Sequence, residues 1–332
     1  MSPLVSFLIP AFKGLFLAKA IDSILSQSFT NFELIIVNDC SPDDIDSIVS
    51  KYNDNRIRYY HNKKNIGGAD LVAQWNKCLE YAVGQWTIMA SDDDIYDSTF
   101  LEELLLLTKK WPDCDVFHSN VKCINANEEL IRLNVPFEEN EDLIHYAYFH
   151  DVHHRWHSMP EWMLRTEKLR KIGGFIDFPS ATWSDVATIY VMAKENGIIC
   201  CNKPLLLARN SGINITFSPK TAIVRAMAWE KYSFWCKSFF QSIIVSTEEE
   251  KWMINQIIDN CPGQYVIRAI INEASINDIK QLLRCEHWPF TLVSKTDIKK
   301  SLIERKRLSL LKNIKFWKKK LIRQMQLFFI DT

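Results

Sequence analysis

The chain has 332 residues, which is long enough for one large domain or for a domain with an appendage. Hydrophobic residues make up 47% and charged residues 24%, a balance that excludes a wholly disordered chain. Lys plus Arg equals Asp plus Glu at 40 each, but residues 299–332 hold 11 Lys or Arg against two acids. An acidic body therefore precedes a basic tail.

Cysteine usage and the apolar runs both favour a cytoplasmic protein. The nine cysteines are odd in number and form no CxxC pair, so neither a disulfide framework nor a zinc site is indicated. The N-terminus has no basic segment and no cleavage-site pattern, so we expect no signal peptide. No uncharged apolar stretch reaches the roughly 20 residues needed to span a bilayer.

Short β-prone runs alternate with helical segments over the first 110 residues. We expect strands at 5–9, 32–37, 57–60 and 86–90, and helices at 15–26, 69–83 and 100–110. A helix start is expected at Ser41 to Asp44, and Thr99 with Glu102 predicts a capping box. The alternation predicts an α/β fold with a mostly parallel sheet flanked by helices.

Beyond residue 218 the sequence pattern changes to long helical segments. We expect a strand at 116–124, a surface loop at 128–142, a helix at 185–195, an extended segment at 198–207, and helices at 221–245, 248–260 and 277–284. A domain boundary near Pro219 would separate a catalytic domain (1–218) from a helical C-terminal region (219–298). A basic amphipathic tail (299–332) follows.

The stretch TIMASDDDIY at 87–96 places three carboxylates at the end of an apolar strand. Adjacent carboxylates in a folded protein need full solvation or a compensating cation. Asp39 also follows a predicted strand, and ligands of parallel sheets bind beyond the carboxyl ends of the strands. A divalent cation held by Asp oxygens and substrate phosphates suits this position.

Further short motifs occur in a fixed order around the Asp cluster. They are VSFLIPAF at 5–12, IVNDCSPD at 36–43, NIGG at 65–68 followed by Trp75-Asn76, GQWTI at 84–88, IGGF at 172–175, WSD at 183–185, NKPL at 202–205 and RNS at 209–211. Together they cover roughly residues 3–216. Their order resembles family 2 glycosyltransferases, which have the GT-A fold and use nucleotide-sugar donors.

The resemblance implies a role for each group of residues. The nucleotide would contact Pro10, Phe12, Asp39, Asn65, Gly67, Asn76 and Asp92. Mn²⁺ or Mg²⁺ would bind Asp93 and Asp94, although Ser91-Asp92-Asp93 and Asp92-Asp93-Asp94 are both readings of the metal motif. Asp185 would be the catalytic base of a single displacement with inversion. Trp183, Ser184, Arg209 and Ser211 would contact the acceptor or close the site.

Several alternatives stay open at the level of sequence. Asp39 can be a turn residue, and Asp185 can cap the helix that follows it. His153, His154 and His157 lack a further spaced metal ligand, so we expect a surface or acceptor-side role. Arg155-Trp156 has Val152 where processive synthases have Gln, which favours transfer of one sugar. No Gly-rich phosphate loop or GxGxxG follows a strand, which disfavours a nucleotidyltransferase and an NAD-dependent enzyme.

The expected activity is metal-dependent transfer of one sugar, from a UDP-sugar to a glycan or lipid-linked acceptor, in cell-surface polysaccharide biosynthesis. The rival is a catalytically degenerate subunit that binds nucleotide sugar or recruits a partner. The tail from Lys312 to Ile330 interleaves cations with bulky apolar residues. It can lie on the inner face of a membrane or pack on the acidic body, including in a homodimer. No module for reading nucleic acid is visible.

Overall fold

The computed structural model describes residues 2–212, 221–261, 263–305 and 307, which form two compact units. The first unit comprises residues up to 217 together with 231–261, and the second comprises 218–230 and the residues from 262 onward. Pro219 and the tail from Lys312 to Ile330 lie outside the described residues. Among the described helices, none is both long and apolar enough to cross a bilayer.

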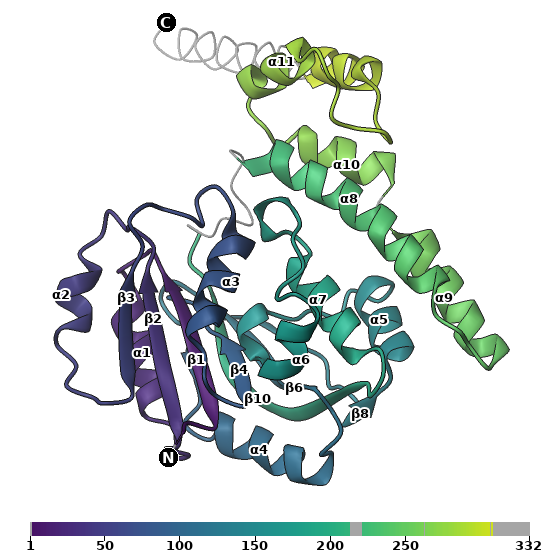
Figure 1. Cartoon of the computed structure of the whole chain (residues 1–332). Helices are drawn as coiled ribbons and strands as arrows, with labels where there is room; N and C mark the ends of the chain where they lie inside the picture. Colours follow the sequence, from purple (N-terminus) through teal and green to yellow (C-terminus); the bar gives the residue numbers. More distant parts are fainter. Residues whose placement is uncertain (1, 213–220, 262, 306, 308–332) are drawn as a thin grey trace, which may run out of the picture. The chain divides into compact units, whose positions relative to one another are not determined.

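One sheet organises the first unit (Figure 1). Its strands are, in spatial order, β3 (Ile57–His61), β2 (Phe32–Asn38), β1 (Val5–Ala11), β4 (Trp86–Met89), β9 (Trp162–Arg165), β6 (Val116–Asn125), β10 (Ile198–Asn210) and β5 (Ile95–Tyr96). Two further strands, β7 (Leu130–Leu133) and β8 (Asn140–Glu141), pair with β6 and β10. β3, β2, β1 and β4 are parallel, as are β6 and β10, whereas β9 runs antiparallel between β4 and β6. The sheet is mostly parallel, as the sequence predicted.

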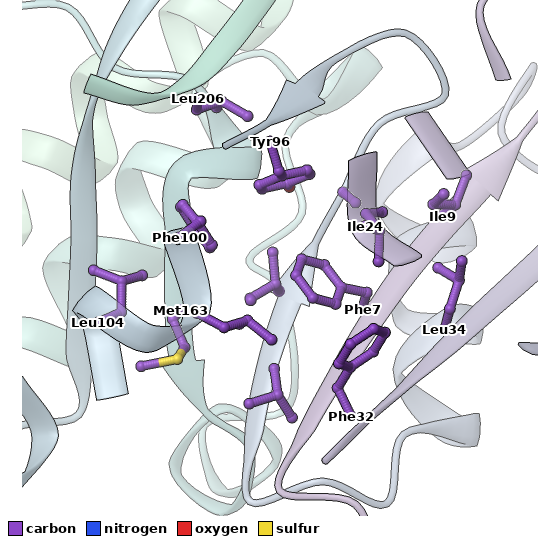
Figure 2. Close-up of a cluster of buried hydrophobic side chains, with 14 of the residues drawn as sticks. Phe7, Ile9, Ile24, Phe32, Leu34, Tyr96, Phe100, Leu104, Met163 and Leu206 are labelled. Carbon is purple, nitrogen blue, oxygen red and sulfur yellow. The ribbon is translucent and has the colours of Figure 1, made fainter. Parts of the chain in front are cut away.

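Helices cover the sheet. Those of the first unit are α1 (Leu17–Leu25), α2 (Ile45–Val49), α3 (Leu71–Tyr81), α4 (Phe100–Lys110), α5 (Leu143–Asp151), α6 (Thr166–Lys171), α7 (Ser184–Ala193) and α9 (Glu248–Asn260), with the 3₁₀ turns η1 (Met159–Glu161) and η2 (Pro179–Ala181). The buried side of the sheet that faces α1 and α4 carries aromatic rings (Figure 2). The Phe7 ring packs edge-on against the rings of Phe32 and Tyr96, with distances between ring centroids of 5.7 Å and 5.3 Å, respectively.

The second unit has its own small core. It contains the first part of α8 (Ala222–Gln241), which continues into the first unit, together with α10 (Gln264–Ile271) and α11 (Ile276–Arg284). Apolar side chains such as Ile267, Ile271 and Ile279 are fully buried there. The buried carboxylate of Glu230 accepts hydrogen bonds from the backbone N–H groups of Thr291 and Leu292.

Two local predictions are wrong. The side chain of Thr99 makes no cap bond; it donates to Asp97, and Glu102 accepts from Ser28 instead. The stretch 128–142, expected as a loop, contains β7 and β8. Every residue of β7 is exposed, so this strand lacks the alternation of buried and exposed side chains from which strands are predicted.

A buried carboxylate locks the strands of the first unit at the amino end of the sheet. Glu33 is 5% exposed, and its Oε1 accepts the Ser6 hydroxyl at 2.6 Å and the Val83 N–H at 2.8 Å. Its Oε2 accepts Arg58 at 2.6 Å. Removing one partner of a buried charged network leaves the other groups desolvated and unpaired, which is more costly than losing an exposed ion pair.

We therefore expect Glu33→Ala to lower the free energy of unfolding by about 3–5 kcal/mol, measured by urea denaturation. The matched control is Glu80→Ala, which removes an exposed i,i+3 pair with Lys77 and should cost less than about 1 kcal/mol. Equal effects of the two substitutions would contradict the assignment of Glu33 as a structural lock.

Candidate active site

Asp39, at the carboxyl end of β2, organises the loop between β3 and α3. The side chain is 2% exposed. Its Oδ1 accepts from the Asn62 amide at 2.7 Å and the Ile66 N–H at 2.8 Å, and its Oδ2 accepts the Gly67 N–H at 2.7 Å. A Cβ at position 67 would stand 3.0 Å from Asp39 Oδ2, which explains the glycine. Since each carboxylate oxygen can accept two bonds, Oδ2 can take one further donor.

The loop after β1 is held between Asp39 and the acidic turn. The Asp39 N–H donates to the Ala11 carbonyl at 3.0 Å. From the other side, Asp92 Oδ2 accepts the N–H groups of Phe12 at 3.0 Å and Lys13 at 2.7 Å. The ends of β2 and β4 thus meet across the end of β1. The Phe12 ring stays 37% exposed at this edge.

The acidic turn is also tied to β10. Ser91 Oγ donates to Asp93 at 3.1 Å and accepts the Asp94 N–H at 3.2 Å. The Arg209 N–H donates to Asp94 Oδ1 at 2.7 Å, and its Nε donates to the Asp93 carbonyl at 2.8 Å. Asp92 is thus held by the loop after β1, whereas Asp93 and Asp94 are both held by Ser91 and Arg209.

Burial makes the acidic turn electrostatically unfavourable. It raises the pKa of Asp92, Asp93 and Asp94. For Asp94, burial and then the negative charge of Asp93 raise the pKa to about 7. The positive charges of Lys13 and Arg209 offset this effect only in part at Asp93. The turn therefore favours an added positive charge, either a proton or a cation.

Arg209 braces the acidic turn. Its side chain is fully buried, and its guanidinium lies 4.2 Å from the centre of the Phe16 ring. It also donates to the Asn125 carbonyl at 3.3 Å and to Glu128 at 3.3 Å. Closure of the site by Arg209 stays a prediction. The same holds for Ser211, which follows β10 and is partly exposed.

A second acidic position lies at the start of α7. The N-cap of this helix is Trp183, with φ of 70°, so the alternative that Asp185 caps the helix is wrong. The buried Ser184 hydroxyl accepts the Phe178 N–H at 3.0 Å and so serves the local fold. Asp185 keeps 25% of its side chain exposed, and its Oδ2 lies 3.7 Å from His157 Nε2.

Asp185 differs from the acidic turn in its titration. Burial alone would raise its pKa, but the neighbouring His157, the hydrogen bond from the Val186 N–H and the nearby His150 together outweigh burial, so the pKa lies below its ordinary value. Asp185 is therefore ionised at neutral pH while part of the carboxylate faces solvent. An ionised carboxylate that solvent can reach is able to accept a proton, as a general base must.

Tyr96, directly after the acidic turn, hydrogen-bonds to η1. It follows Asp94 by two residues, and its hydroxyl donates to the Pro160 carbonyl of η1 at 2.8 Å. Burial, and then the charges of Asp94 and Glu161, raise the pKa of Tyr96. Burial raises the pKa of Glu161 as well, with a contribution from Asp185. Tyr96 thus senses the charge of the acidic turn, and Glu161 senses that of Asp185.

Three further residues of the predicted nucleotide site serve neighbouring backbone. The Asn76 amide donates to the Phe175 carbonyl at 3.3 Å and accepts its N–H at 2.8 Å. This clamp holds the turn at Gly174 against α3. Asn65 accepts the N–H of Gly68 in its own loop, and Pro10 lies opposite Val37 in the sheet. Contacts from Asn76, Asn65 and Pro10 to a nucleotide stay predictions.

The acidic turn fits a hard divalent cation. Within the described residues, no three His, Cys, Asp or Glu side chains are arranged around one point as a complete metal cage. Mg²⁺ and similar ions are commonly held by only one or two carboxylates, with substrate phosphates and water completing the shell. Asp93 and Asp94 have carboxylate oxygens of that kind, and burial raises the pKa of both, which favours an added positive charge.

Solved structures share this architecture. The chain superposes with TM-score 0.55 on Staphylococcus aureus TarS residues 1–349 in complex with UDP-GlcNAc, at 18% identity over 92% of each chain. The mannosyltransferase PcManGT from Pyrobaculum calidifontis, in complex with GDP-Man and Mn²⁺, gives a TM-score of 0.53 at 14% identity over 96% of this chain and 83% of its own. The fold is that of GT-A glycosyltransferases.

Sequence similarity identifies the family. The family model "Glycosyl transferase family 2" matches residues 6–173, and the chain belongs to this family. The putative colanic acid biosynthesis glycosyl transferase WcaA of Escherichia coli is 38% identical over 96 residues, which are 28% of this chain and 33% of WcaA. The match covers between 21% and 41% of the length of these and similar curated relatives.

The sequence missed the surroundings of Asp185. His153 and His154 are exposed as expected, but His157 is only 7% exposed. Its neighbours Tyr146 and His150 lie on α5, which was not predicted because apolar and aromatic residues occupy all sides of that helix. No spacing rule joins residues from 146, 157 and 185, so no sequence signal indicated this cluster.

The raised pKa of Asp94 predicts a pH-dependent stability. A carboxyl that binds its proton more tightly in the folded state stabilises the fold at low pH, and this stabilisation is lost as pH rises through the folded pKa. In metal-free buffer, the free energy of unfolding of the wild type, relative to that of Asp94→Asn, should fall between pH 4 and pH 7. The fall amounts to about 1.4 kcal/mol per unit of pKa shift.

Adding Mn²⁺ at pH 8 should then raise the Tm of the wild type more than that of Asp94→Asn. Thermal unfolding followed by circular dichroism across the pH range measures both effects. Parallel pH curves for the two proteins, together with equal responses to Mn²⁺, would show that Asp94 does not carry the charge imbalance.

Proposed function

We propose that the protein is a metal-dependent, inverting glycosyltransferase that moves one sugar from a UDP-sugar to a hydroxyl of a glycan or lipid-linked acceptor. The observation that carries the proposal is the gathering of Asp39 and Asp92–Asp94 around the end of β1, together with an ionised and partly exposed Asp185 at the start of α7. Such a set of carboxylates serves a reaction in which a diphosphate leaves and a hydroxyl loses its proton.

The nucleotide would lie at the edge formed by β1 and β2. Asp39 Oδ2 can accept one more hydrogen bond, which suits the ring N–H of a uracil base. The exposed Phe12 ring, next to the same edge, offers an apolar surface. The TarS complexes with UDP and UDP-GlcNAc support a uridine nucleotide, although the fold alone also accommodates GDP-Man in PcManGT.

Asp93 and Asp94 would hold Mn²⁺ or Mg²⁺, and the Mn²⁺ complex of PcManGT supports this assignment. When bound, the cation neutralises charge on the departing nucleoside diphosphate. The Lys13 ammonium lies close enough to Asp92 and Asp93 to offset part of the rise in their pKa values. It therefore adds positive charge at the same place. Arg209 and Ser91 hold the turn in the orientation that binding requires.

Asp185 would remove the proton of the acceptor hydroxyl. As the hydroxyl oxygen forms its bond to the anomeric carbon, the bond from that carbon to the β-phosphate oxygen breaks and the proton passes to the Asp185 carboxylate. One displacement inverts the configuration. Trp183, which stacks on Tyr232 at 4.4 Å, precedes Asp185 by two residues and would line the acceptor side.

The acceptor belongs to surface polysaccharide synthesis in this proposal. The resemblance to WcaA, named for colanic acid biosynthesis, supports such a role. Attachment to the inner face of a membrane, or association as a homodimer, would involve the tail from Lys312 to Ile330, and its support is the alternation of cations and apolar residues in the sequence.

The purified full chain, incubated with Mn²⁺ and a panel of UDP-sugars and GDP-Man, should release nucleoside diphosphate from a UDP-sugar. Asp185→Asn should lower kcat by about 10²–10⁴ while calorimetry shows unchanged UDP binding. Asp93→Asn should weaken Mn²⁺-dependent UDP binding. Asp113→Asn, an exposed carboxylate in the loop after α4, is the matched control and should change neither property.

UDP binding without turnover of any donor by the folded wild type would support the degenerate subunit instead. Full activity of Asp185→Asn would remove the assignment of the base while leaving the family unchanged.

A further inference from the structure

His157 lies between the proposed base and a buried phenol. Its Nε2 is 3.7 Å from Asp185 Oδ2, and its Nδ1 is 2.9 Å from the hydroxyl of Tyr146. The His157 side chain is 3% exposed and the Tyr146 residue is fully buried. The three residues come from α5, from the segment before η1, and from α7, so their alignment is a product of the tertiary fold.

The hydrogen bonds determine the tautomer of His157. Burial raises the pKa of Tyr146 well above its ordinary value, so its hydroxyl stays protonated and donates to Nδ1. An Nδ1–H tautomer would leave the Tyr146 proton without this acceptor and would direct the Nε2 lone pair at a carboxylate. Burial also lowers the pKa of His157, and Asp185 offsets this only in part. The ring is therefore neutral, with its Nε2–H directed at Asp185.

We propose that His157 is a positioning residue for the transfer reaction: held by Tyr146 as the Nε2–H tautomer, it orients Asp185 and keeps it ionised for the acceptor hydroxyl. This inference rests on the proposed function. The present 3.7 Å separation is longer than a normal hydrogen bond, and such contacts commonly shorten when substrate binds. His157 keeps its proton throughout, and the acceptor proton goes to Asp185.

Other ionisable groups surround this pair. The His150 ring stacks on His157 at 4.6 Å and is hydrogen-bonded to Asp151 at 2.8 Å. His150 lowers the pKa of both His157 and Asp185, whereas Asp151 raises that of His157. The groups that face the pair are His150 and Asp151 on α5, Glu161 on η1 and His118 on β6. Of the groups around Asp185, His157 contributes most to lowering the pKa of Asp185 and so favours its ionised form.

The experiment uses the full chain with UDP-GlcNAc, Mn²⁺ and water as acceptor, and follows UDP release from pH 3 to pH 9, because the pKa of Asp185 lies below its ordinary value. His157→Ala should raise the pKa of the acid limb of the kcat profile by about 1 unit, because the carboxylate loses a hydrogen-bond donor. His157→Gln keeps an N–H donor and should restore most of the wild-type profile. His118→Gln is the matched control, since His118 is also a buried histidine but bonds to Glu161, and it should leave the acid limb in place.

A second readout does not depend on turnover. Long-range ¹H–¹⁵N spectra should show His157 as the neutral Nε2–H tautomer, and Tyr146→Phe should produce a mixture of tautomers. An Nδ1–H tautomer in the wild type, or an acid limb that stays unchanged in His157→Ala, would overturn the inference. If the wild type releases no UDP from UDP-GlcNAc or from any other UDP-sugar of the panel while the tautomer is as expected, the proposed function fails and the positioning role for catalysis fails with it.

Discussion

Buried carboxylates at the carboxyl edge of a parallel sheet are the constraint on which the rest of the structure depends. A buried carboxylate is tolerated only when donors or cations surround it. Asp39 therefore accepts hydrogen bonds from the loop at 62–67. Asp92 accepts them from the loop after β1, and Asp94 accepts one from the end of β10. Segments that are far apart in the chain thus meet at one edge, and the acids define the geometry of the loops that contact them.

The second half of the site follows a different principle. Around Asp185 the neighbours are aromatic and imidazole rings, many of them buried, and few formal charges are close. His157 stacks on His150, and Trp183 stacks on Tyr232. In such surroundings a single hydrogen-bond donor has a large effect on a carboxylate, because water competes little. The acidic turn consequently favours a cation, whereas Asp185 is ionised without one.

Sequence reasoning was most successful where the hydrophobic pattern and the chain order determine structure. β1, β2 and β4 were predicted because each is an apolar run closed by Pro or Asp, and the family followed from the order of short motifs. The exposed β7 and the helix α5 have no such period. The predicted site residues were identified by type, but their partners were not: Asn76 clamps Phe175, and His157 meets Asp185 only through the tertiary fold.

The proposed function requires Asp93 or Asp94 to hold a cation beside the departing diphosphate, with Asp185 on the acceptor side. Anomalous diffraction at the manganese edge from crystals grown with UDP and Mn²⁺ tests it most directly. The account predicts one manganese peak about 2.1 Å from an oxygen of Asp93 or Asp94 and in contact with the UDP phosphates, with the uracil ring beside Asp39. Manganese or UDP bound away from these aspartates would contradict it.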